Sequence, residues 1–179
     1  MQNKDELRKF AKNLRKTLNI NEISEKILQI FLSSDYYKSA QNIAAYYPYG
    51  TELNITKLFN DNSKNFYLPK MNEDDQITFH QYQKGDFLAK NSYGIFEPTG
   101  KEINVNIIDT IIIPALLVDK RGFRLGYGKG CYDKFFNKYA LKVKKIVFIP
   151  DELMVNSLPT DKYDIPADVI VTQTKLSSL

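Results

Sequence analysis

The order of hydrophobic and polar residues indicates helices and strands that alternate along most of the chain. Apolar residues recur at three- and four-residue spacing over residues 3–18, where Leu7, Phe10, Ala11, Leu14 and Leu18 share one helix face. The further predicted helices span residues 22–33, 53–59, 131–139 and 152–155. Short apolar runs between turn residues predict strands at residues 42–47, 65–68, 77–82, 108–118, 145–148 and 169–172.

This alternation indicates an α/β fold, a three-layer sandwich in which helices flank a mostly parallel central sheet. The chain of 179 residues is long enough for one domain with a substantial core. Residues 87–104 are expected to be mainly loop, and no change of composition marks a linker. We therefore expect a single domain over residues 1–179.

A glycine-rich segment at residues 124–133, RLGYGKGCYD, follows the most apolar predicted strand. Its three alternate glycines allow left-handed backbone and let a ligand approach the amides closely. The helix predicted after it would direct its positive end at an anion, and Arg124 and Lys129 add charge. Ligands of parallel sheets bind at the carboxyl ends of strands, where this segment is expected.

The spacing of this segment matches neither the nucleoside-triphosphate P-loop nor the dinucleotide fingerprint. A tight strand-to-helix turn is the alternative interpretation, with Asp133 merely favouring the helix N-terminus. Arginine, lysine and aspartate interleaved with three glycines favour a phosphate site, in which Asp133 is suited to holding a metal ion.

Composition limits the compartment and the partners. A single cysteine, no apolar leader and no long uncharged apolar run predict a cytoplasmic protein that neither is secreted nor spans a membrane. The formal net charge of +4 is modest, and the lysines are spread along the chain. Such a diffuse positive field suits an anionic metabolite better than nucleic acid.

The glycine segment and its neighbours resemble the 5-formyltetrahydrofolate cyclo-ligase family, also called 5,10-methenyltetrahydrofolate synthetases. The central match covers DTIIIPALLVD at residues 109–119 and GFRLGYGKGCYD at residues 122–133. Weaker matches follow the family's order: Lys4 and Arg8, YYPYGTE at 46–52, LP at 68–69, GIFEP at 94–98 and YDIPAD at 163–168. The resemblance thus covers nearly the whole chain.

The resemblance implies a ligase that uses ATP and Mg²⁺ to convert 5-formyltetrahydrofolate to 5,10-methenyltetrahydrofolate, with release of ADP and phosphate. The γ-phosphoryl group would pass to the formyl oxygen before N10 attacks the formyl carbon. Positioning and charge neutralisation dominate such catalysis. The expected partners are these two small molecules, without nucleic acid or membrane, and the protein is expected to be a monomer.

The resemblance also implies roles for individual residues. Arg124 and Lys129 would be catalytic, and Asp133 and Asp164 would hold the metal. The residues implied in ATP binding are Lys4, Arg8, Arg124, Leu125, Gly126, Tyr127, Gly128, Lys129, Gly130, Cys131 and Tyr132. The residues implied in folate binding are Tyr47, Glu52, Tyr127, Gly128, Lys129, Gly130 and Cys131.

Each assignment has a structural alternative. Lys4 and Arg8 would belong to a solvated basic face, because Lys9, Lys12, Arg15 and Lys16 make that helix basic all round. Glu52 would merely favour the start of the helix after Thr51, and Asp164 would be a turn residue.

Two positions depart from the family pattern. Cys131 stands where tyrosine is usual, and Tyr163 stands where histidine is common. We expect Cys131 to pack or line the loop, since the reaction needs no thiolate. The single histidine, His80, lies on a predicted strand away from every motif, so no histidine base is expected.

Two other functions remain open from the residues alone. A sugar-phosphate isomerase or transferase would also need a phosphate loop, but neither ATP nor the paired aspartates. A basic nucleic-acid-binding module would require clustered cations with aromatic platforms, which the scattered lysines do not provide.

Overall fold

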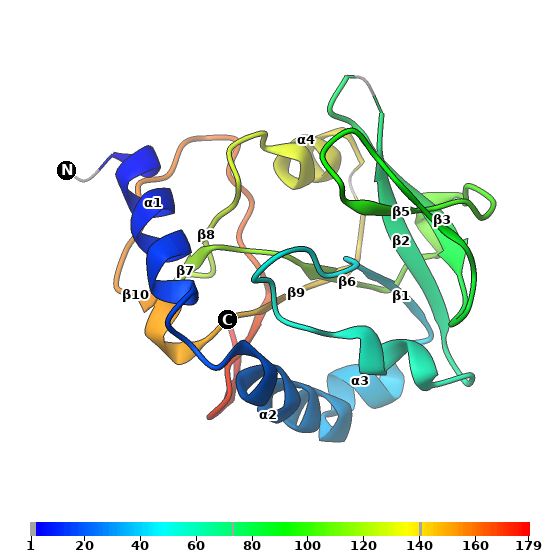
Figure 1. Ribbon diagram of the computed structural model, residues 1–179, viewed down its shortest axis with the longest axis horizontal. Helices are drawn as coiled ribbons and strands as arrows, with labels where there is room; N and C mark the ends of the chain where they lie inside the picture. The colour runs from blue at the N-terminus through cyan, green and yellow to red at the C-terminus, as the bar shows by residue number, and fades with distance from the viewer. Residues whose placement is uncertain (1–2, 73, 140) are drawn as a thin grey trace.

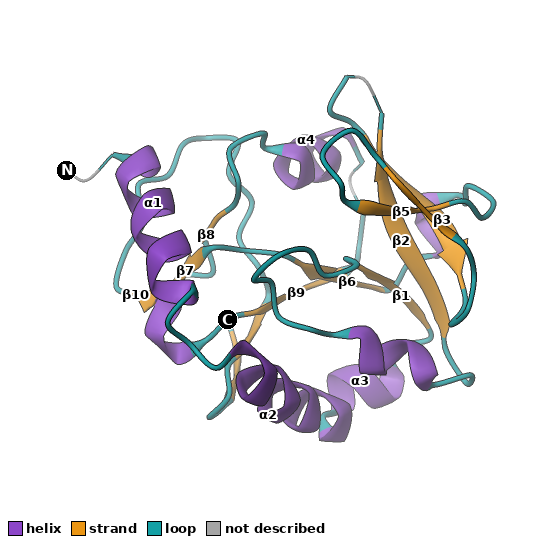
Figure 2. Ribbon diagram, in the orientation of Figure 1, coloured by secondary structure: helices purple, strands orange, loops and turns teal. Residues whose placement is uncertain are grey.

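The computed structural model describes residues 3–72, 74–139 and 141–179, and a seven-stranded sheet forms its centre (Figures 1 and 2). The strands lie in the order β12-β11-β9-β6-β1-β2-β3. Each of the two edge strands is antiparallel to its neighbour: β12 pairs with β11, and β3 pairs with β2. All other pairs in this sheet are parallel. The strands are β1 (Asn42–Ala45), β2 (Asn65–Met71), β3 (Ile77–Tyr82), β6 (Thr110–Ile113), β9 (Lys144–Phe148), β11 (Val169–Val171) and β12 (Leu176–Ser178).

Strand β6 shows why the central strands are apolar on both faces. Ile111 and Ile113 belong to one hydrophobic core, and Ile112 belongs to the other. All three side chains are fully buried, as expected for a parallel sheet covered on both sides.

Helices cover the two faces of the sheet. On one side α1 (Lys4–Arg15) and α4 (Cys131–Lys138) contribute Leu7 and Phe135 to the first core. On the other side α2 (Ile20–Ser33), α3 (Asp35–Ser39) and the 3-10 helix η1 (Thr56–Asn60) form the second core, which includes Phe31 (Figure 1). The expected α/β fold with a mostly parallel central sheet is confirmed. Among the described residues, no helix combines the length and apolar character needed to cross a membrane.

The expectation of one strand over residues 108–118 was wrong. Strand β6 ends before Pro114, which has no N–H to donate to a sheet. The chain continues as β7 (Leu117–Asp119), which pairs with β8 (Arg124–Leu125) and β10 (Met154–Val155) in a separate small sheet. The glycine-rich segment therefore begins with β8 of this small sheet and does not leave the central sheet directly.

Other short elements were also mispredicted, because a few residues carry too weak a pattern. Residues 87–104 are mainly loop, as expected, but the hairpin of β4 (Leu88–Lys90) and β5 (Phe96–Pro98) within them was not anticipated, nor was η2 (Val105–Ile107) after them. Of the helix expected at residues 53–59, only the second half is helical, as the 3-10 helix η1, which begins at Thr56. The helix expected at 152–155 is the 3-10 helix η3 (Asp151–Leu153) followed by β10. Helix α3 and strand β12 were not anticipated.

Candidate active site

A cavity of about 630 Å³ lies between the glycine-rich segment, α1, the chain after β1 and the β4–β5 hairpin. Every site residue predicted from the sequence lines it. They are Lys4, Arg8, Tyr47, Glu52, Arg124, Leu125, Gly126, Tyr127, Gly128, Lys129, Gly130, Cys131, Tyr132, Asp133 and Asp164. These residues come from four separate parts of the chain and converge on one space.

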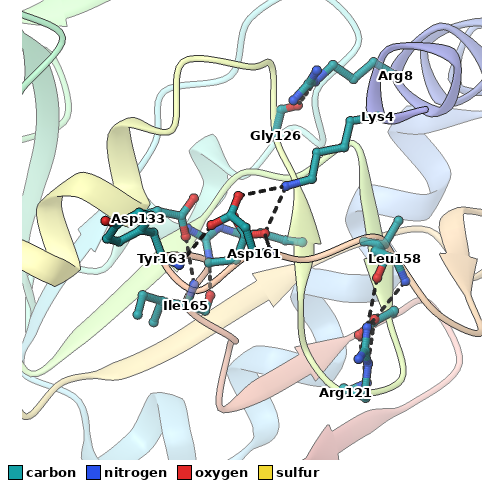
Figure 3. A network of polar contacts seen from close by, with 12 residues as sticks. Lys4, Arg8, Arg121, Gly126, Asp133, Leu158, Asp161, Tyr163 and Ile165 are labelled. Atoms are coloured by element: carbon teal, nitrogen blue, oxygen red, sulfur yellow. Dashed lines mark hydrogen bonds and ion pairs between the residues drawn. The ribbon is translucent and has the colours of Figure 1, made fainter. Parts of the chain in front are cut away.

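Helix α1 contributes two cations to this cavity. Asn3 and Glu6 form a capping box that fixes the start of the helix beside the site. Lys4 Nζ lies 3.0 Å from an Asp164 oxygen and 3.4 Å from an Asp161 oxygen, and Arg8 Nε donates to the Gly126 carbonyl at 3.0 Å (Figure 3). Burial lowers the pKa of Lys4, but the two aspartates outweigh it and the net shift is upward. Neither cation therefore belongs to a solvated face.

The same helix corrects a second expectation. Arg15 does not belong to a basic surface, because only 2% of the residue is exposed. It continues the buried stripe of Leu7 and Ala11, and its Nη2 donates to the Ala115 carbonyl at 2.7 Å. Phe10, expected on the apolar face, is instead 52% exposed.

The glycine-rich segment has the backbone conformation that its glycines allow. Gly128 and Gly130 have φ angles of 115° and 64°, a left-handed region that other residues rarely adopt. Helix α4 begins directly after Gly130, so its first turn, Cys131 to Asp133, lines the cavity. The positive end of the helix therefore faces the space where an anion would lie.

Arg124 and Asp133 pair across the segment. Arg124 Nη2 lies 2.9 Å from Asp133 Oδ1, and the Arg124 side chain is only 4% exposed. The Ile165 backbone amide donates to the same Asp133 oxygen at 3.1 Å, while Arg124 Nη1 donates to the Ile165 carbonyl. Ile165 is thereby bound to both ends of the glycine-rich segment.

The two aspartates expected to hold a metal both keep an oxygen available. Asp133 accepts through Oδ1, and Asp164 accepts through Oδ2 from Lys4 and from the Asp161 amide at 2.9 Å. The second carboxylate oxygen of each accepts no hydrogen bond from the described residues. Over residues 3–72, 74–139 and 141–179, no three His, Cys, Asp or Glu side chains gather as a metal site. Two carboxylates nevertheless fit Mg²⁺, which takes its remaining ligands from phosphate and water.

Tyr47 and Glu52 form the other end of the cavity. The Tyr49 amide donates to Glu52 Oε2 at 2.9 Å, and the next helix, η1, begins only at Thr56, so Glu52 is not a helix-start residue. Burial raises the pKa of the Glu52 carboxyl, against lowering by the Tyr49 amide, Tyr127 and Arg15. Tyr47 packs edge-to-face on Phe96, with ring centroids 5.7 Å apart.

Lys129 contacts two residues that sequence reasoning missed. Its Nζ lies 2.8 Å from Asp75 and 3.4 Å from the Tyr93 hydroxyl, above the Tyr93 ring. Tyr93 lies in the β4–β5 hairpin, in the region expected to be loop. The neighbouring GIFEP match was the only sequence signal that pointed to this hairpin.

The expected roles of Cys131 and His80 agree with the geometry. Cys131 Sγ lies 3.4 Å from Met71 Sδ, and burial raises the pKa of the thiol, so it stays protonated. His80 lies on β3, and its Nδ1 contacts the Gly100 carbonyl. It does not line the cavity.

A family model provides the decisive comparison. The model of the 5-formyltetrahydrofolate cyclo-ligase family matches residues 1–173 of this chain. The chain belongs to this family. A 5-formyltetrahydrofolate cyclo-ligase of Haemophilus influenzae is 31% identical over 180 residues, covering 93% of this chain and 94% of the relative. The Escherichia coli K12 cyclo-ligase is 27% identical over 146 residues, covering 76% of this chain and 80% of the relative.

Solved structures of cyclo-ligases share the fold. The NMR structure of Aquifex aeolicus 5,10-methenyltetrahydrofolate synthetase superposes with a TM-score of 0.86 at 31% identity, covering 98% of this chain and 92% of that one. The Mycoplasma pneumoniae synthetase superposes with a TM-score of 0.77 at 24% identity, covering 96% and 99%. The resemblance stated from the sequence is confirmed, as is the expectation that the protein is an enzyme.

Proposed function

We propose that this protein converts 5-formyltetrahydrofolate to 5,10-methenyltetrahydrofolate, with cleavage of ATP to ADP and phosphate. One observation carries the proposal: the residues expected to bind phosphate and those expected to bind folate line the same cavity. The reaction requires this, because the formyl oxygen must lie in line with the γ-phosphate. Family membership favours the ligase over the sugar-phosphate and nucleic-acid interpretations.

The glycine-rich segment and α1 are suited to the nucleotide. The amides of residues 126–130 and the first turn of α4 would donate to phosphate oxygens. Lys4, Arg8 and Lys129 supply positive charge at the cavity wall. Arg124, held by Asp133 and Ile165, would stabilise the charge that develops on the transferring phosphoryl group.

Glu52 and Tyr47 are suited to the pterin. The donor edge of a 2-amino-4-oxo pterin matches a carboxylate acceptor, and the Glu52 carboxylate lines the cavity with one oxygen bound to the Tyr49 amide. The rings of Tyr47 and Phe96 offer an aromatic wall for a flat heterocycle.

The chemistry explains why charge and positioning suffice. A formyl group on N5 is an amide, so its carbon is a poor electrophile and its oxygen a poor leaving group. Transfer of the γ-phosphoryl group to that oxygen breaks the bond to ADP and forms a formyl phosphate ester with an iminium-like carbon. The N10 electron pair then forms a new C–N bond, N10 releases its proton to phosphate or solvent, and phosphate leaves with the former formyl oxygen. No protein nucleophile takes part.

Asp133 and Asp164 would hold Mg²⁺ through their available oxygens. When bound, the ion would neutralise the phosphate oxygens during transfer. The aspartates also bind Arg124 and Lys4, so each would position a cation and a metal together.

The test combines the protein with 5-formyltetrahydrofolate, ATP and Mg²⁺ and follows the near-ultraviolet absorption of methenyltetrahydrofolate. We expect product only when ATP is present, with one ADP released for each product molecule. A non-hydrolysable ATP analogue serves as the control and should give none. Product formation that does not depend on ATP, or no product at all, would contradict the proposal. The cytoplasmic location and the monomeric state stay predictions.

A further inference from the structure

A second cavity, of about 670 Å³, adjoins the candidate active site. It lies between η1, the end of β3 and residues 84–88, which lead into β4. Tyr47 and Phe96 line both cavities, so these two rings form a wall that the cavities share. Of the residues assigned to ATP, Mg²⁺ or the pterin, only Tyr47 and Phe96 line the second cavity.

The second cavity is rich in aromatic side chains. The Tyr47 ring stacks on the Phe59 ring with centroids 6.2 Å apart, and it meets the Tyr82 ring edge-to-face at the same distance. Phe87 is 75% exposed, the highest value among the large apolar side chains of the described residues. Thr99 Oγ1 donates to the Phe87 carbonyl at 2.9 Å, which fixes the backbone that carries this ring. A ligand with an aromatic ring would bury Phe87 favourably.

The charged residues of the second cavity favour an anion. Lys57 and Lys84 line it together with one acid, Asp86, among the described residues. Asp86 Oδ2 accepts from the Gln83 amide at 2.8 Å, and the Asp86 amide donates to the Gln83 carbonyl at 3.0 Å, so Asp86 stabilises the turn that carries Lys84. Lys57 Nζ lies 2.7 Å from Glu25 in an exposed ion pair, which is weak enough for a ligand carboxylate to compete with.

A folate carries an aromatic ring and negative charge beyond its pterin. N10 is attached to a p-aminobenzoyl ring, and this ring carries a glutamate whose carboxylates are ionised at neutral pH. Each further glutamate, joined through a γ-carboxyl group, adds one carboxylate. A pterin that lies against Tyr47 and Phe96 is already at the wall of the second cavity, so the groups attached to N10 are within reach of it.

We propose that the second cavity binds the p-aminobenzoylglutamate part of the folate, with the benzoyl ring against Phe87 and the glutamate carboxylates at Lys84 and Lys57. This proposal rests on the proposed function, because it requires a folate in the first cavity. The cations assigned to phosphate, Lys4, Arg8, Arg124 and Lys129, do not line the second cavity, so it is separate from the nucleotide site.

Equilibrium binding without ATP tests the role of the two lysines. The probes are 5-formyltetrahydrofolate with one glutamate and the same folate with three, each titrated by calorimetry. We expect wild-type protein to bind the triglutamate about three- to tenfold more tightly, and the double variant Lys57→Met with Lys84→Met to bind both probes alike. An equal affinity for the two probes in wild-type protein, or an unchanged preference in the double variant, would overturn the proposal.

The matched control is the double variant Lys16→Met with Lys101→Met. It removes the same amount of charge from two exposed lysines that line neither cavity, and it should keep the wild-type preference. If this control loses the preference as well, the lysines act only through net charge, and the proposed site is refuted. Higher ionic strength should reduce the preference of wild-type protein, because these charges are exposed to solvent.

Phe87→Ala tests the place of the benzoyl ring. We expect it to weaken the binding of both probes by about three- to tenfold while their ratio stays the same. Phe10→Ala, which removes an exposed ring outside both cavities, is the control and should bind both probes like wild-type protein. Unchanged affinities in Phe87→Ala would remove this residue from the site and contradict the proposal.

The two proposals fail separately. If wild-type protein forms no methenyltetrahydrofolate but shows a triglutamate preference that depends on Lys57 and Lys84, the proposed function fails and the second site stands. If it is active but binds the two folates alike, only the second site fails. A loss of ATP affinity in the lysine double variant, with folate binding unchanged, would assign the cavity to the nucleotide and overturn the proposal.

Discussion

Arg124 Nη2 lies 2.9 Å from Asp133 Oδ1, and this pair joins the first and last residues of the glycine-rich segment. The same aspartate oxygen accepts from the Ile165 amide. The segment that would bind phosphate is therefore held at both ends, and Ile165 is held with it. Groups fixed in this way need little reorganisation when charge develops in a transition state.

Arg124→Ala should lower kcat by about 10²–10³, because Arg124 would stabilise negative charge that develops on the phosphoryl group during its transfer. The KM for folate should change far less, and Arg124→Lys should recover only part of the rate, since lysine cannot reproduce the two directed contacts. Initial rates over a range of folate concentrations measure both constants. Lys120→Ala, an exposed cation of the same β7–β8 hairpin, is the control. Equal losses in kcat and in folate binding would argue against this role.

Asp133→Asn and Asp164→Asn should each raise the Mg²⁺ concentration needed for half-maximal rate, by about tenfold or more. An amide keeps the shape of the side chain but removes the charge that a hard cation prefers. The measurement is a titration of the initial rate with MgCl₂ at saturating ATP. Asp161 lines the same cavity and contacts Lys4, so Asp161→Asn is the control. It should leave the Mg²⁺ requirement unchanged. A normal requirement in Asp133→Asn would remove that residue from the metal site.

The free energy of unfolding of wild-type protein, compared with that of Glu52→Gln, should fall as the pH rises. Burial raises the pKa of Glu52, so the folded state holds its proton at a pH where the unfolded chain, with a pKa near 4.5, has lost it. The contribution of Glu52 to stability is fully present below pH 4.5 and falls as the pH rises through the pKa of the folded state. Urea unfolding of both proteins between pH 4 and pH 8 measures the difference. A difference that is constant with pH would contradict this account.

Gly122→Ala should destabilise the protein by about 2 kcal/mol or more, because Gly122 has a φ of 86° and a Cβ would lie 2.7 Å from the Ala167 carbonyl oxygen. Gly126→Ala is the matched control within the same β7–β8 region: its Cβ would meet no atom within 4 Å, and its φ is not in the left-handed region. We expect it to change the free energy of unfolding by less than about 0.5 kcal/mol. Equal urea midpoints for the two variants would show that Gly122 is not constrained as described.

Much of the fold was predictable from local pattern. Helical periodicity indicated α1 and α2, and apolar runs indicated β1, β3, β6 and β9, because these elements bury enough residues to leave a repeating signal. The short β7, β8 and β10 strands and the β4–β5 hairpin were missed. Two or three residues show no period, and their pairing depends on segments far away in the chain.

The candidate site was also predictable in part from the sequence. The sequence by itself determined the glycine-rich segment and the start of α4, because alternating glycines followed by a helical apolar pattern are a local signal. Together with the family resemblance, it also named many of the residues that line the cavity, but not those of the β4–β5 hairpin such as Tyr93.

Only the tertiary structure decided what the charges of α1 do. Arg15 is buried and Phe10 is exposed, against their own hydrophobicity. The reason is physical: a side chain's environment is set by the segments that pack against it. For Arg15 these segments include the one that carries the Ala115 carbonyl, 100 residues along the chain.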